Sequence, residues 1–347
     1  MKALSWPRWF ASVAGLFVLA VVVAVLCTMI GAERVSWAQV DPLADFIKAV
    51  KGGELSRDSA ILLKLRLPRL LMAGIVGAAL SVAGAGFQGL LRNPLADPFI
   101  LGVSGGGALG AIIAIALGVG TVLGSVPAVP LFSFLGAFGT VLVVFRIARI
   151  EGRVPAHTLL LAGVVANAFL SALIMFVVSI TKVSIAYSIV SWMMGSVGYE
   201  SYSTILGISA YVIAGGALLF GLSRDLNLMS LGEDAAHQTG VAVERTKGAA
   251  FFAASLVTGA VVSVSGLIGF VGLIVPHVTR LIFGPDHRLL VPCSMLAGAI
   301  FLMICDTLAR TIIAPTEIPV GVVTALCGGP FFILLLRRRQ SRGFVEA

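Results

Sequence analysis

Few residues of this chain are placed to do chemistry, and the clearest are two opposite charges inside an apolar stretch. Asp306 and Arg310 lie four positions apart, with the acid first. That spacing puts both side chains on one face of a helix, where they can form an ion pair. A proton relay would need further acids at the same depth, and the apolar stretches offer no second one. The pair is therefore predicted to be structural, or a surface feature of the helix end.

The sequence lacks the motifs of a zinc protease and of an ATPase. It contains no H-E-x-x-H and no glycine directly followed by lysine, so it has no phosphate-binding P-loop. The histidines are spread over three loops and the cysteines form no C-x-x-C pair, so no metal site is predicted. We expect interfacial histidines and small buried cysteines, at His157, His237, His277 and His287, and at Cys27, Cys293, Cys305 and Cys327.

The polar segment at about 223–246 suggests a mechanical function. Residues 231–240 predict a short helix, a glycine stop and a second turn. Asp234-Ala235-Ala236-x3-Gly240 is close to the E-A-A-x3-G coupling signature of ABC importer permeases, with Asp in place of Glu. A short helix at the membrane surface can fit a cleft on a soluble ATPase and transmit rigid-body motion. The candidate coupling residues are Leu231, Gly232, Glu233, Asp234, Ala235, Ala236 and Gly240.

The composition predicts that these residues belong to an all-α membrane protein that crosses the bilayer many times. Of 347 residues, 59% are hydrophobic and 12% charged, and the mean hydropathy is +1.06. Soluble domains are about 45–50% apolar and about 25% charged. The net charge of +8 is scattered over loops and helix ends, which argues against a nucleic-acid partner. We predict one transmembrane domain over residues 1–347.

Ten apolar segments have the length of a membrane-crossing helix, which is about 20 residues. The first is too long to be the core of a signal peptide. Only the glycines of 266–269 separate the seventh from the eighth, and an even number of spans places both termini on one side. The segments are residues 9–31, 66–90, 99–118, 128–148, 156–180, 202–222, 247–266, 267–283, 289–313 and 318–337.

The distribution of basic residues predicts which side of the membrane each loop faces. With cytoplasmic termini, the short outer loops hold little beyond Lys182 and Arg310, while a longer outer segment, 33–66, has mixed charges. This is the positive-inside pattern, so we predict that both termini are cytoplasmic. The inner basic residues are Arg92, Arg146, Arg149, Arg153, Arg224, Arg245, Lys247, Arg280 and Arg288, with Arg337, Arg338, Arg339 and Arg342 in the tail.

One phrase of the sequence occurs twice. Residues 81–94 return as residues 263–276 with one insertion and one deletion, and a fainter echo pairs 163–166 with 321–324. Such repeats are typical of transporters, although chance similarity among glycine-rich helices is the competing explanation. The copies are five spans apart, and an odd offset means that the second half runs inverted through the membrane. We predict repeat halves at about 61–180 and 247–337.

Regularly spaced small residues predict close helix packing. Gly102, Gly106 and Gly110 recur every four positions, which would put them on one helical face. A second series starts at Gly77 and continues through small residues to Gly89. General glycine richness is the alternative, since the chain has 40 glycines.

Several longer phrases closely resemble the FecCD-type permeases of type II ABC importers, which carry vitamin B12, haem and ferric siderophores. They run in family order from the second span to the last, whereas the first span and first outer loop match weakly. The phrases are residues 66–69, 93–98, 101–106, 159–164, 192–195, 269–277, 286–288 and 317–324.

The resemblance implies a ten-helix permease in the bacterial inner membrane that pairs with a second copy. Two ABC ATPase subunits, which would bind the ATP, are expected below and a periplasmic substrate-binding protein above. Arg66, Arg69 and Arg310 match arginines that meet carboxylates on the binding protein, a role that suits the bidentate geometry of arginine.

The resemblance also implies a cytoplasmic gate. Asn93 and Leu95 match positions near that gate in the vitamin B12 permease. On the other half of the gate, Ala156 and His157 stand where the family member has two hydroxyl residues, which puts the chemistry of the gate in doubt.

The leading functional hypothesis is therefore a non-enzymatic transport subunit that moves a metal chelate (ferric siderophore, haem or cobalamin) inward at the expense of ATP on a partner. The alternative is an ion-coupled secondary transporter with the same inverted repeat, which would need buried acids. An intramembrane enzyme is disfavoured, because the apolar segments contain few groups of polar residues that could form an active site.

Overall fold

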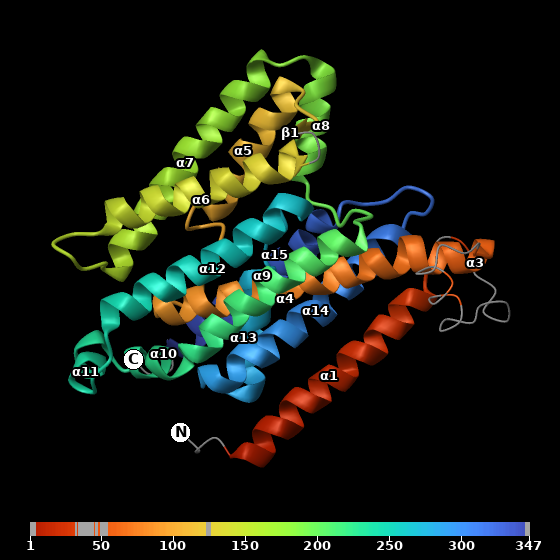
Figure 1. Ribbon diagram of the computed structural model, residues 1–347. Coiled ribbons are helices and arrows are strands. Elements are labelled where there is room, and N and C mark those ends of the chain that lie inside the picture. The colour runs from red at the N-terminus through yellow and green to blue at the C-terminus, as the bar shows by residue number, and fades with distance from the viewer. Residues whose placement is uncertain are drawn as a thin grey trace.

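The computed structural model describes residues 5–31, 33, 45, 48, 55–122 and 126–343, with side chains through residue 333. This part of the chain is a helical bundle with one short hairpin, β1 (Thr121–Val122) paired antiparallel with β2 (Val126–Pro127) (Figure 1). It contains 7 helices long and apolar enough to cross a membrane, and four shorter apolar helices. The predicted all-α membrane fold is confirmed.

Each of the ten predicted spans corresponds to a helix. The second span begins earlier than the predicted residue 66, because α3 and the π-helical turn η2 continue directly into α4. The short helices α8 and α10 were not predicted as separate elements. In the described part of the first half, the helices are α1 (Trp6–Met29), α3 (Arg57–Ala60), η2 (Ile61–Arg66), α4 (Leu67–Leu90), α5 (Val103–Leu117), α6 (Ala128–Ala148), α7 (Ala156–Ile180), α8 (Val183–Met193) and α9 (Tyr202–Gly221).

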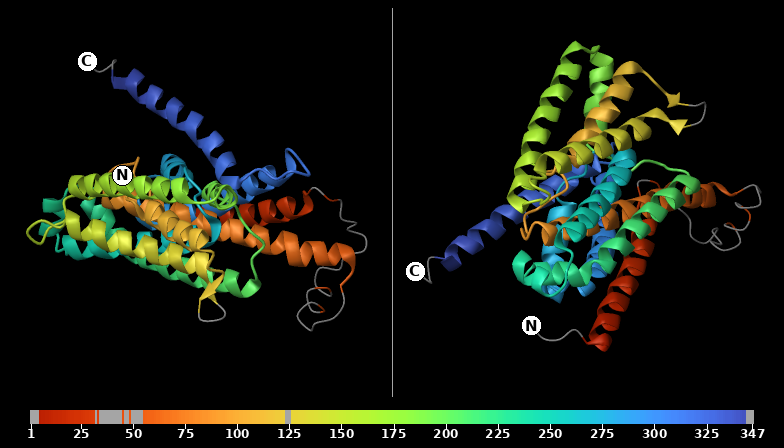
Figure 2. Two further views of the ribbon diagram at one scale, coloured as in Figure 1. Left: turned by 90° about the horizontal axis from the view of Figure 1, so that it is seen from above. Right: turned by 60° about the vertical axis from the view of Figure 1, so that its left-hand side comes forward.

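The second half of the chain begins with two short helices outside the apolar spans. They are α10 (Ser223–Met229) and α11 (Glu233–Gln238), followed by α12 (Val243–Ser265), α13 (Val271–Phe283), α14 (His287–Thr311) and α15 (Val320–Gly343). Figure 1 shows α5 to α8 as a group on one side of a central layer that includes α4, α12 and α14, with α1 on the opposite side. Figure 2 shows α15 extending away from the bundle towards the C-terminus.

Helix lengths can be compared between the two predicted repeat halves, whose inverted relation stays a prediction. The series α4 to α7 has lengths of 24, 15, 21 and 25 residues, and α12 to α15 has 23, 13, 25 and 24. Both short helices, α5 and α13, follow a residue with positive φ, Gly102 and Phe270.

The repeated phrase itself does not mark equivalent positions, and that part of the prediction is wrong. Its first copy is helical up to Leu90, whereas its second copy leaves α12 at Ser265 and enters α13 at Val271. Gly266, with φ of +65°, ends the helix inside the second copy.

Small residues bring the central helices into backbone contact. A Cβ at Gly77 of α4 would meet the carbonyl of Gly298 in α14, and one at Gly84 would meet the carbonyl of Gly272 in α13. Gly106 and Gly110 lie in the same way against α6. Gly102 differs from the prediction, because it precedes α5 with φ of +80° and so turns the chain instead of extending the helical face.

Aromatic side chains fill the centre where α4, α6 and α12 meet. The ring of Phe251 lies 6.0 Å from that of Phe87 and 5.4 Å from that of Phe145, measured between centroids. Phe87 and Phe251 are fully buried. Three cysteines are buried as predicted, but Cys327 is exposed in the single chain.

Candidate functional site

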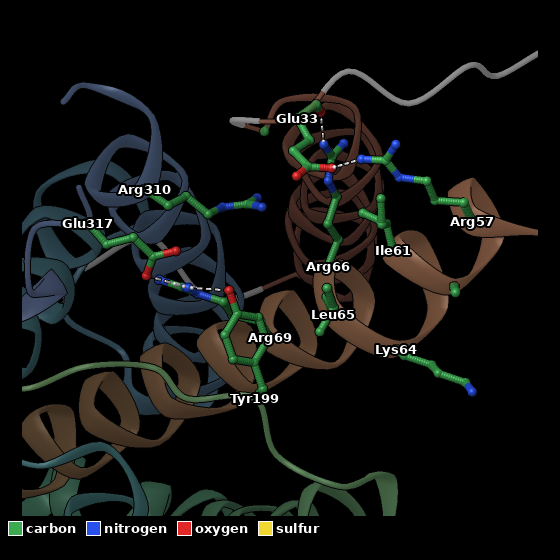
Figure 3. Close-up of a pocket in the computed structure, with 12 residues that line it drawn as sticks. Glu33, Arg57, Ile61, Lys64, Leu65, Arg66, Arg69, Tyr199, Arg310 and Glu317 are labelled. Atoms are coloured by element: carbon green, nitrogen blue, oxygen red, sulfur yellow. Dashed lines mark hydrogen bonds and ion pairs between the residues drawn. The ribbon is translucent and has the colours of Figure 1, made fainter. Parts of the chain in front are cut away.

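The three arginines predicted to dock a binding protein lie together at the α3 end of the bundle. Arg66 of η2, Arg69 of α4 and Arg310 of α14 line one cavity of about 610 Å³ (Figure 3). Their exposed fractions are only 6%, 5% and 8%. The structure therefore brings these residues together, but each is buried and engaged within the chain.

Arg69 is the centre of this arginine cluster. Its Nε donates to Asp306 Oδ1 at 3.0 Å, and its Nη1 donates to Glu317 Oε2 at 2.8 Å and to the hydroxyl of Tyr199 at 3.3 Å. One guanidinium thus joins α4 to α14 and to the loops that precede α9 and α15 (Figure 3). Arginine suits such a position because its planar fork carries five donors.

Asp306 is fully buried and lies between two cations. Besides Arg69, the Nε of Arg310 lies 3.7 Å from Asp306 Oδ2. The predicted Asp306–Arg310 pair is therefore present and structural, and the idea that it is a surface feature is wrong. The closer partner, Arg69, is 237 positions away in the sequence, so no local spacing could have indicated it.

Arg66 and Arg310 also hold the end of the first span. Arg66 Nη1 donates to the Thr28 carbonyl at 3.1 Å, and Arg310 Nη2 donates to the Cys27 carbonyl at 2.9 Å. Both carbonyls belong to the last turn of α1, where cations satisfy unpaired oxygens and oppose the helix dipole. The docking role of the three arginines stays a prediction, while Arg57 and Lys64 supply the exposed cations of this cavity.

The coupling segment forms a compact unit at the opposite end of the bundle. Gly232 and Gly240 bound α11 with φ of +128° and +86°, values that favour glycine. Beneath the helix, Ala236 packs with Met229, Val241 and Val243 in a small apolar cluster of its own. The predicted short helix and glycine stop are both present.

The outer face of this segment is exposed in the single chain. Leu231 is 72% exposed, beside the charged residues of α11. Asp234, Ala235 and Gly240 are also exposed, whereas Glu233 is only partly so and Ala236 is buried.

The predicted gate residues lie in two separate places. Asn93 Oδ1 accepts a hydrogen bond from the backbone of Leu95 at 3.0 Å, and Leu95 lines a small cavity with residues of α13 and α15. Ala156 and His157 begin α7 and line a different cavity, of about 650 Å³, with Arg92 and the coupling segment. A single chain does not gather the four residues, and their gating role stays a prediction.

A buried acid in the same loop as Asn93 was not singled out from the sequence. Asp97 is 7% exposed, and its Oδ1 accepts from the Phe99 backbone at 2.8 Å. Burial raises the pKa of Asp97 to about 6, although the hydrogen bond from Phe99 opposes the shift. His287, which was expected at the membrane interface, is buried within the protein, and its ring contacts Asn227 of α10. In the described residues no group of histidine, cysteine and acidic side chains could hold a metal ion.

Comparison with known proteins agrees with the resemblance carried by the sequence phrases. The FecCD transport family matches residues 18–338. The cobalamin import system permease protein BtuC of Halobacterium salinarum is 45% identical over 278 residues, which cover 80% of this chain and 73% of that protein. The hemin transport system permease protein HmuU of Yersinia pestis is 41% identical over 290 residues, covering 81% and 85%.

A solved structure gives the same result for the fold. A metal-chelate type ABC transporter in an inward-facing conformation superposes with a TM-score of 0.82 and 33% sequence identity, covering 94% of this chain and 98% of that one. With the family match extending over nearly all of the helical bundle, the chain belongs to the FecCD transport family of membrane permeases.

Proposed function

We propose that this chain is the permease subunit of an ATP-driven importer that moves a metal chelate, such as a ferric siderophore, haem or cobalamin, into the cytoplasm of a bacterium. It pairs with a second copy in the inner membrane, receives cargo from a periplasmic binding protein and is driven by two separate ABC ATPase subunits. The named relatives, which import cobalamin and hemin, support the chelate class.

The observation that carries the proposal is the construction of α11. It is a short helix outside the apolar spans, bounded by two glycines and supported by its own apolar cluster (Figure 1). A unit built in this way moves as a rigid body when a partner pushes on its exposed face. The exposed Leu231 offers the apolar anchor that a partner would bury.

The buried charges argue against ion coupling by a secondary transporter. Asp306 of α14 is fully buried, and both Arg69 and Arg310 lie beside its carboxylate. Protonation of this carboxylate would leave Arg310 buried without its acidic partner and Arg69 with Glu317 alone. Asp306 is therefore a poor proton or sodium carrier.

A second copy would account for the exposed side of α7. Large apolar side chains such as Phe169 and Met175 are 64% and 75% exposed in the single chain.

The basic residues Arg92, Arg146 and Arg149 lie near the α11 end, so this end is assigned to the cytoplasm together with both termini.

Reconstituted vesicles test this function. The permease, with its partner ATPase and binding protein, should take up chelate only when ATP is supplied on the ATPase side, and a protonophore should leave the rate unchanged. Radiolabelled or fluorescent chelate measures the uptake. Uptake without ATP that collapses with the proton gradient would favour the secondary transporter instead.

The left-handed conformation of Gly240 gives a second test. Gly240→Val should keep ATP hydrolysis but lose most transport, because a β-branched residue is strained at φ of +86° and would displace the end of α11. Gly240→Asn is the matched control, since asparagine tolerates this region. Uptake and phosphate release are measured in the same vesicles, and normal coupling in Gly240→Val would count against the coupling role.

The exposed cations of the arginine cavity give a third test. Replacing both Arg57 and Lys64 by glutamate should weaken docking of the binding protein at low salt much more than at high salt, since exposed pairs are screened. These changes leave the buried ion pairs of Arg69 intact. Lys182→Glu, at an exposed position before α8, is the control. Docking measured by biolayer interferometry that is equal in the double variant and the parent would refute this surface.

A further inference from the structure

A buried ammonium group lies at the α11 end of the bundle. Lys247, in the second turn of α12, is 3% exposed although it belongs to the polar surroundings of the coupling segment. Removing an ammonium from water is costly unless anions and hydrogen-bond acceptors replace the solvent. The partners of Lys247 therefore determine what this residue does.

All three donors of Lys247 are used, each on a different element. Its Nζ lies 2.6 Å from Glu233 Oε2 of α11, 3.1 Å from Glu244 Oε1 of α12 and 2.9 Å from the Val154 carbonyl in the loop before α7. An ammonium has three donors, so this set satisfies it fully.

Two of these partners extend the network further. Glu233 Oε1 accepts from Arg92 Nη2 at 3.3 Å, and Glu244 Oε2 accepts from the backbone of Val154 at 2.8 Å. Two cations and two anions thus form a neutral cluster, which we name the Lys247 cluster: Arg92, Glu233, Glu244 and Lys247.

The backbone at Arg92 indicates that its side chain is held in a specific place. Arg92 follows the end of α4 with φ of +50°, a position where glycine or asparagine is usual. A non-glycine residue in this region is strained and persists when other contacts favour it. The ion pair with Glu233 is such a contact.

The cluster links the coupling segment to both parts of the predicted gate. Arg92 directly precedes Asn93, and Val154 lies two positions before Ala156. Glu233 belongs to α11 and Lys247 to α12, so three segments meet at the ammonium, and Arg92 joins a fourth segment through Glu233.

We infer that Lys247 is a positioning residue through which movement of α11 reaches both gate segments, an inference that rests on the function proposed above. Without the ammonium, Glu233 and Glu244 would face each other with one cation too few, and α11 would separate from the loop before α7. ATP-driven movement of α11 would then no longer displace the gate.

The test uses the complete importer in vesicles and measures chelate uptake and ATP hydrolysis together. Lys247→Met keeps the apolar stem and removes the charge, and it should lower the chelate imported per ATP about fivefold or more while hydrolysis continues. Glu233→Gln, at a partly exposed position, should act in the same direction. The double variant should be no worse than Lys247→Met, since both changes break one network. Arg146→Met removes an exposed charge at the same end and should leave the ratio unchanged.

A distance measurement separates linkage from a merely structural role. Spin labels at Gln238→Cys and Arg149→Cys measure the distance between the end of α11 and the start of the loop before α7. The background is Cys327→Ser, in which the other cysteines are buried. The distance should be the same with and without ATP in the parent and should change with ATP in Lys247→Met. Because this measurement does not depend on uptake, it judges the linkage even if the parent fails to import chelate.

Two results would overturn the inference. One is a Lys247→Met importer with the parental ratio of chelate to ATP. The other is a label distance that stays unchanged by ATP in Lys247→Met and Glu233→Gln, whatever their uptake.

Discussion

Charges buried in a low-dielectric bundle must be neutralised, and this constraint shapes both ends of the molecule. At the α3 end, Asp306 and Glu317 balance Arg69 and Arg310. At the α11 end, Glu233 and Glu244 balance Lys247 and Arg92. Each of the two groups includes ion pairs between segments far apart in the sequence, because the solvent that a buried charge loses must be replaced by groups from several elements.

The helix α4 runs between these two charged regions. Arg66 and Arg69 lie at its beginning, and Arg92 follows its end. Along its length it is almost completely buried, and backbone contacts at Gly77 and Gly84 hold it against α14 and α13. A close-packed helix of 24 residues is about 36 Å long and transmits displacement with little compression. The fold thus provides a rigid connection between the proposed docking surface and the proposed gate.

The pattern of apolar segments and the positions of helix-ending glycines predicted much of this structure. The ten spans and the glycine-bounded coupling helix depend on local composition and on backbone freedom at Gly232 and Gly240, which are visible in the sequence. The partners of Arg69 and Lys247 could not be predicted, since they depend on how distant helices pack. The repeated phrase wrongly indicated equivalent positions in the two halves. Gly266 ends α12 inside the second copy, whereas the first copy stays helical almost to its end, so the two copies lie at different distances from a helix end.

The assignment of the α11 end to the cytoplasm and the α3 end to the periplasm is the claim on which the account depends, and thiol accessibility tests it directly. In a Cys327→Ser background, Lys64→Cys and Gln238→Cys carry one exposed thiol each at opposite ends of the bundle. In intact cells with a permeable outer membrane, an impermeant maleimide should label Lys64→Cys, and should label Gln238→Cys only after the inner membrane is opened. The reverse pattern would contradict the account.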